Sequence, residues 1–74
     1  GLVVLHTHPG HASSLAYYID KKYVSEQLKN NHDYGIIGTI AGDDTAILIS
    51  KSQKYLNKIL SILKNEFPYL KIEN

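Results

Sequence analysis

Apolar positions recur along this chain with two periods, which predict its elements of secondary structure. Residues 2–5 (LVVL) form a β-branched run that predicts a strand continuing to Thr7. Next comes a series with the i, i+3, i+4, i+7, i+11 spacing of an amphipathic helix: Ala12, Leu15, Ala16, Ile19 and Tyr23. Helix-favouring residues extend this predicted helix to about Leu28 or Lys29, and a polar loop ending at Gly35 follows.

Two β-rich segments, 36–41 and 45–50, flank Gly42-Asp43-Asp44. Because glycine and aspartate accept turn conformations, this arrangement predicts an antiparallel hairpin. The helical period then returns at Leu56, Ile59, Leu60, Leu63 and Phe67. Pro68 should end this second helix, and Ser50 or Ser52 should cap its start. The predicted fold is an α/β (α+β) two-layer sandwich of order β-α-β-β-α, with a mainly antiparallel sheet and two helices on one face.

The length of 74 residues allows one domain, spanning 1–74, and a chain of this size buries only about 60% of its unfolded surface. Cysteine is absent, which excludes disulfides, thiolate catalysis and Cys-based metal sites. Self-association is therefore the first expected source of added stability.

A hydrophobic content of 43% argues against disorder, and no apolar run approaches the length of a membrane span. No signal segment opens the chain, so we expect a cytoplasmic protein without membrane partners.

The charge balance gives little reason to expect nucleic-acid binding by this chain alone. The net charge is +1, and all eight basic residues are lysines. Without arginine, the chain has no bidentate guanidinium fork for phosphate or guanine. We therefore expect this chain to bind nucleic acid poorly on its own.

Three histidines lie close together in HTHPGH, at His6, His8 and His11. Histidines two apart on a strand share a face, and His-x-His-Pro resembles the metal motif of JAMM-type deubiquitinating metalloproteases. Asp20, however, lies one residue too far from His8 for that motif, and on a helix such a slip rotates a ligand by about 100°. The family's early glutamate is also missing, since the first glutamate is Glu26. We therefore predict no metal and no catalytic residue, and a metalloprotease fragment remains only a weak alternative.

The adjacent carboxylates of Asp43 and Asp44 are a second candidate site. Like charges at a hairpin tip repel each other, and turn chemistry needs only one aspartate. A functional pair would bind a cation, which could be a metal, an ammonium or a guanidinium that carboxylates grip through several N–H donors. A metal is the weaker choice because Asp20, the other obvious oxygen ligand, lies in another element. A plain polar turn is the structural alternative.

The string GTIAGDDT at 38–45 follows HTHPGHA at 6–12 and a predicted helix that reaches Ile19-Asp20. Together, over roughly residues 2–63, these motifs resemble the C-terminal domain of bacterial arginine repressors. The eight-residue string is specific, whereas the HTxPG string alone would be weak. The stretch between Asp20 and Gly35 is longer than the family's usual link, and we expect it to extend the first helix or to cover a subunit edge.

The resemblance implies a regulatory role. In that family this domain forms trimers that stack into hexamers, and L-arginine, an effector rather than a cofactor, binds where the trimers meet. Asp43 and Asp44 would hold chiefly the guanidinium, Asp20 would contact the amino end, and Ala41 would contribute its backbone. Ser13 stands where the family usually has glutamine or histidine, so it would act through a water or leave that contact unmade.

The expected function is thus effector binding and hexamerisation in an arginine-responsive transcriptional regulator. Operator DNA would be bound by an N-terminal winged helix-turn-helix domain that is absent from this chain. Lysine or citrulline is an alternative effector if Ser13 has retuned the site. A ligand-independent structural oligomerisation module is the alternative function.

Overall fold

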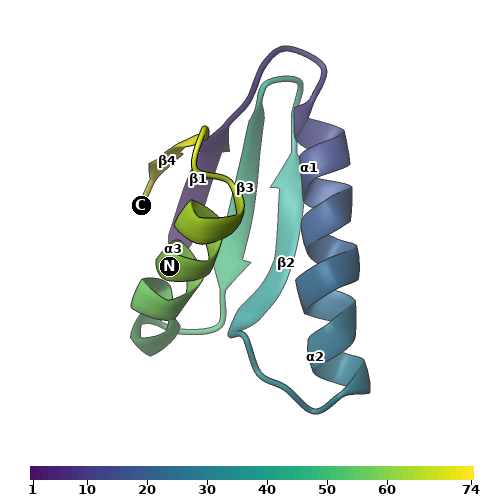
Figure 1. The fold of residues 1–74 in the computed structure, drawn as a ribbon, viewed down its shortest axis with the longest axis vertical. Coiled ribbons are helices and arrows are strands. Elements are labelled where there is room, and N and C mark those ends of the chain that lie inside the picture. The colour runs from purple at the N-terminus through teal and green to yellow at the C-terminus, as the bar shows by residue number, and fades with distance from the viewer.

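The computed structural model describes residues 1–74, and its elements follow the predicted order with additions (Figure 1). In chain order they are β1 (Leu2–His6), α1 (Ala12–Ile19), the π-helical turn η1 (Asp20–Val24), α2 (Ser25–Lys29), β2 (Ile36–Ala41), β3 (Thr45–Ser50), the 3-10 turn η2 (Gln53–Tyr55), α3 (Leu56–Glu66) and β4 (Lys71–Glu73). The predicted α+β class and the order β-α-β-β-α are confirmed. None of the helices has the length and apolar character needed to cross a bilayer.

The four strands form one sheet in the order β2-β3-β1-β4, and every neighbouring pair is antiparallel. The predicted hairpin is formed by β2 and β3, while β1 lies on the other side of β3 in a register that pairs Val3 with Leu48. The strand β4 was not predicted, because three residues after a proline are too few to show a period of two. It pairs with the outer edge of β1.

Both helical units cover the same face of the sheet and share one core. The side chains that point to this face alternate along β1 and β3, as the period of two requires: Val3 and Leu5, then Ala46 and Leu48. Ile19 of the first helix and Leu63 of the last are fully buried against them. Figure 1 shows α1 and α2 as one long rod beside β2, with α3 over the part of the sheet that holds β1.

The extra length after Asp20 extends the first helix, which is one of the two roles that the sequence analysis expected for it. The helix continues through η1 and α2 to Lys29, and the polar loop then returns to β2. Gln27 holds this return, because its side chain donates to the carbonyl of Ile36 and accepts the N–H of Tyr34. At Gly35 the backbone has a φ of 79°, and an added Cβ would lie 2.1 Å from Cγ of Tyr55, so only glycine fits.

Two predicted boundaries need correction. The first strand ends at His6 rather than Thr7, because the N–H of Thr7 leaves the sheet and donates to the carbonyl of Asp44. Neither serine caps the last helix. The hydroxyl of Ser50 donates to the carbonyl of Gly1, and Ser52 precedes the turn η2 without a side-chain cap bond. The turn separates the serines from the start of α3, which a sequence pattern alone does not reveal.

Candidate functional site

The two sequence motifs meet through backbone hydrogen bonds between the β1–α1 loop and the β2–β3 turn. The N–H of Thr7 donates to the carbonyl of Asp44 at 2.8 Å, and the N–H of Gly10 donates to the carbonyl of Asp43 at 3.0 Å. The N–H of Ala12, at the start of α1, also donates to the Asp43 carbonyl, at 3.3 Å. Both carbonyls of the acidic pair are therefore occupied inside the protein.

The hairpin also completes the N-terminus of α1. His11 at the N-cap makes no side-chain cap bond, so the first N–H groups of the helix need other acceptors. The Asp43 carbonyl supplies one of them. Gly10 has a φ of 82°, a left-handed conformation that turns the chain after Pro9 and aims the Gly10 N–H at the hairpin. The HTHPG motif is thus a loop shaped to hold the GDD turn.

The side chains of Asp43 and Asp44 remain exposed at the tip. Oδ1 of Asp44 accepts the hydroxyl of Thr45 at 3.0 Å, and the Asp43 carboxylate has no hydrogen-bond partner. The three ion pairs of the chain join His6 to Glu73, Lys22 to Glu66 and Lys51 to Asp33. Neither carboxylate of the hairpin is neutralised by a cation of its own chain.

Asp20 is held to the same hairpin from the helical layer. It is the first residue of η1, it is half-buried, and its Oδ1 accepts the hydroxyl of Thr39 at 2.9 Å. A β-bulge between Ile36 and Gly38 makes this possible. The extra residue shifts the alternation of β2 so that Thr39 and Ala41 face the helices. The other oxygen of the Asp20 carboxylate makes no hydrogen bond within the chain.

Ser13 and Ala41 complete the predicted set. Ser13 is exposed near the start of α1 and lies seven residues, or two helical turns, before Asp20, which places both on one side of the helix. Ala41 is the last residue of β2 and pairs with Ala46 next to the acidic turn. Because α1 and η1 both pack against β2, the five residues lie along the border between the first helix and the hairpin.

Thr39 is the residue that sequence reasoning missed at this border. It belongs to the same GTIAGDDT string, two residues before Ala41, and residues two apart on a strand share a face. That spacing was the available signal. The hydrogen-bond acceptor of Thr39 is Asp20, which lies 19 residues earlier in the chain. The sequence alone did not indicate this pairing.

The three histidines do not form a metal centre. Nε2 of His6 lies 2.5 Å from Oε2 of Glu73 on β4, and this hydrogen bond lowers the pKa of the Glu73 carboxyl. The rings of His8 and His11 meet edge to face with centroids 6.1 Å apart. No three His, Asp or Glu side chains gather into a group that could hold a metal ion, so the geometry offers nothing to the metalloprotease alternative.

Comparison with known proteins decides the family. The family model described as "Arginine repressor, C-terminal domain" matches residues 1–65. The chain belongs to this family. The predicted resemblance is therefore confirmed, and the matched range includes the long stretch between Asp20 and Gly35.

Individual arginine repressors are similar over most of the chain. The arginine repressor of Bacteroides thetaiotaomicron is 39% identical over 67 residues, which cover 90% of this chain and 37% of that protein. The arginine repressor of Solibacter usitatus is 36% identical over 88% of this chain and 41% of that protein, and the one of Thermus thermophilus is 33% identical over 97% and 36%. The chain therefore spans only 36% to 41% of the length of these relatives. Their family is one of transcriptional regulators, and the prediction that the chain is not an enzyme is confirmed.

Proposed function

We propose that this chain is the effector-binding and self-assembly domain of an arginine-responsive transcriptional regulator. The observation that carries the proposal is the exposed pair Asp43 and Asp44, whose carbonyls are held by the β1–α1 loop while their carboxylates have no cation of their own. A guanidinium offers directed N–H donors in a planar fork, and two neighbouring carboxylates match it better than they match a compact ammonium.

The remaining predicted residues fit the other end of L-arginine. Asp20 is fixed by Thr39 and retains one carboxylate oxygen without a partner, so it is suited to receive the α-amino group. Ser13 lies on the same side of the helix and would reach the ligand through a water. Ala41, next to the turn, would add its backbone groups. The five residues border an open surface, which is consistent with a site that neighbouring subunits complete.

Self-assembly is supported by the sheet face that the helices leave uncovered. Leu2 of β1 and Ile40 of β2 are 54% and 60% exposed there, and Val4, Ile47 and Ile49 alternate with the buried core residues. Ile37, at the bulge, is a further exposed apolar residue. A contiguous apolar sheet face on so small a domain favours coverage by other copies of the chain. We propose trimers built on this face and hexamers formed from two trimers.

Charge would couple the ligand to assembly. Each subunit brings two carboxylates to the interface between trimers, and their repulsion in a partly desolvated contact opposes assembly. A guanidinium bound between carboxylates of different subunits removes that repulsion. Since ligand that prefers the hexamer must stabilise the hexamer, each arginine would contribute a coupling of about 1–3 kcal/mol.

DNA binding would belong to the part of the repressor that lies outside this chain. A net charge of +1 without arginine offers little attraction for phosphates, and we propose that an N-terminal winged helix-turn-helix domain contacts the operator. Assembly would raise operator affinity because several tethered DNA-binding domains act together. The protein would then act in the cytoplasm, where both DNA and free arginine are present.

Calorimetry and sedimentation of the chain with L-arginine test the proposal. Asp44→Asn should weaken binding by roughly tenfold to a hundredfold, which corresponds to about 1.5–3 kcal/mol for a hydrogen bond between charged groups. Glu26→Gln, which changes a carboxylate of α2, is the matched control and should bind as the parent does. Equal affinities for Asp44→Asn and the parent would refute the role of the acidic pair.

The same measurements separate the alternatives. Citrulline has the shape of arginine without its charge, so the acidic pair should bind it much more weakly. Lysine as the preferred ligand would indicate that Ser13 has retuned the site. A particle mass that does not change with arginine, together with no heat of binding, would favour a ligand-independent assembly module.

A further inference from the structure

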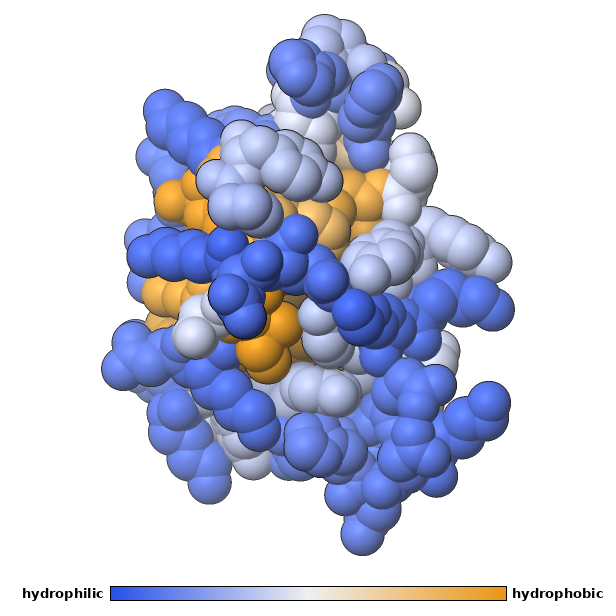
Figure 2. Space-filling view, in the orientation of Figure 1, coloured by the Kyte–Doolittle hydropathy of each residue, from blue (hydrophilic) through white to orange (hydrophobic).

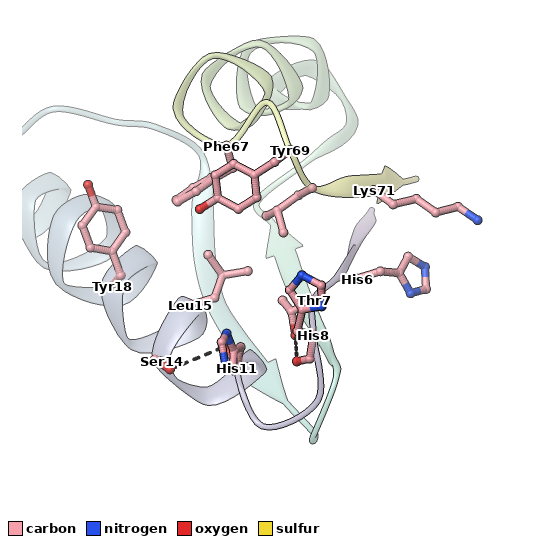
Figure 3. Close-up of a pocket in the computed structure, with 11 residues that line it drawn as sticks. His6, Thr7, His8, His11, Ser14, Leu15, Tyr18, Phe67, Tyr69 and Lys71 are labelled. Atoms are coloured by element: carbon pink, nitrogen blue, oxygen red, sulfur yellow. Dashed lines mark hydrogen bonds between the residues drawn. The ribbon is translucent and has the colours of Figure 1, made fainter.

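A separate hollow lies beside the β1–α1 loop (Figure 3). It is a groove of about 590 Å³ between that loop, the first turns of α1 and the connection from α3 to β4. None of the five predicted arginine-binding residues lines it. Ser14 lines the groove, whereas Ser13 does not, because neighbouring residues of a helix face different sides.

The floor and one wall of the groove are apolar and aromatic. Leu15, Phe67 and Leu70 come from the core side. Tyr69 is 78% exposed, and its ring meets that of Phe67 edge to face with centroids 6.4 Å apart. Figure 3 shows Leu15 and Tyr69 on facing sides of the hollow, and Figure 2 shows apolar atoms exposed on this side of the molecule among hydrophilic side chains.

The opposite wall carries two hydrogen-bonding rings without partners. His8 and His11 make no side-chain hydrogen bond in the chain, and Figure 3 shows them on the loop side of the groove, across from Tyr69. An imidazole donates through one ring nitrogen when neutral and through both when charged, so each ring can donate in either state. No carboxylate lines the groove, and Lys71 is the only lining residue with a full charge.

We propose that this groove binds a small aromatic carboxylate. Its volume lies in the range of small-molecule sites, which combine apolar walls with a few polar groups that set orientation. The ring of the ligand packs between Leu15 and Tyr69, and its carboxylate accepts hydrogen bonds from His8 and His11. The Lys71 side chain points away from the hollow (Figure 3), so its ammonium adds positive potential only at longer range.

Titration of the chain with 3-phenylpropanoate, followed by proton–nitrogen correlation NMR, tests the proposal. We expect saturable shifts centred on Leu15, Tyr69 and Leu70, and weaker binding of the uncharged 3-phenylpropanamide. His11→Ala should weaken binding of the acid about tenfold by removing one donor to a charged group. His32→Ala, which removes an exposed imidazole outside the groove, is the matched control and should bind as the parent does.

A second variant keeps the test independent of the histidines. Ser14→Phe places a ring into the groove from an exposed helix position and should block the probe. Saturable shifts that are absent, or that centre elsewhere, would overturn the proposal, as would equal affinity for the acid and the amide. L-arginine should not displace the probe. If it does, the groove is not a separate site, whereas failure of arginine to bind anywhere leaves the groove assignment intact.

Discussion

The hydroxyl of Thr39 donates a hydrogen bond of 2.9 Å to Oδ1 of Asp20 and so ties the β2 strand to the point where the first helix becomes π-helical. A carboxylate that is half-buried and held at one oxygen has few orientations left. Thr39 therefore positions Asp20 relative to the acidic turn two residues beyond Ala41. Under the proposed function, it orients a group that binds arginine without touching the ligand itself.

Replacing Thr39 by valine tests this positioning role. Thr39→Val keeps the shape and β-propensity of the side chain but removes the donor, at a cost of about 1 kcal/mol in the free energy of unfolding. Arginine affinity should fall several-fold because Asp20 loses its preferred orientation. Thr39→Ser retains the hydroxyl and should restore most of the affinity. Loss of stability with unchanged arginine affinity in Thr39→Val would show that the contact is only structural.

The pattern of apolar positions predicted the five main elements, the hairpin and the single covered face, because burial on one side of a strand or helix leaves its period in the sequence. It did not predict β4, whose three residues are too few to carry a period. It also did not predict the bulge at Ile37, which breaks the alternation of β2 and turns Thr39 toward Asp20. Backbone hydrogen bonds such as that from Gly10 to Asp43 depend on carbonyls, which every residue has, so no side-chain pattern reports them.

The two glycines with similar backbone angles should respond differently to alanine. At Gly10, with φ of 82°, nothing lies within 4 Å of an added Cβ, so Gly10→Ala carries only the left-handed backbone penalty of about 1–2 kcal/mol. At Gly35, the same backbone penalty is joined by a Cβ only 2.1 Å from Cγ of Tyr55. Gly35→Ala should therefore destabilise the chain far more. Urea unfolding measures both, and equal losses would contradict this account.

Acid should weaken the link between the α2–β2 loop and the connection from β3 to α3. Hydrogen bonds from Lys51 and Tyr55, and the N–H of Gly35, lower the pKa of Asp33 from 3.8 to about 2. A lowered carboxyl pKa gives stability that is present above the unfolded value and is lost as pH falls through the folded one. Unfolding midpoints in urea should therefore decline between about pH 4 and pH 2.

Two variants identify the source of that decline. Asp33→Asn cannot titrate, so its unfolding midpoint should change less over the same pH range. Lys51→Met removes the largest cause of the shift and should bring the pKa of Asp33 closer to its usual range. If Asp33→Asn follows the parent at every pH, other carboxylates cause the acid sensitivity.

The uncovered sheet face should control assembly through its apolar character. Ile40 is 60% exposed on that face, beside Ile47, whereas Leu28 is 82% exposed on α2 in the helical layer. Ile40→Lys places a charge where copies of the chain would meet, so it should lower the particle mass in sedimentation or light scattering. Leu28→Lys adds the same charge and removes a similar apolar side chain elsewhere, so it should leave the mass unchanged.

Both positions are exposed in the single chain, so neither change should cost more than about 0.5 kcal/mol of folding stability. A loss of mass in both variants would trace assembly to general apolar attraction rather than to the sheet, and a loss in Leu28→Lys alone would move the interface to the helices.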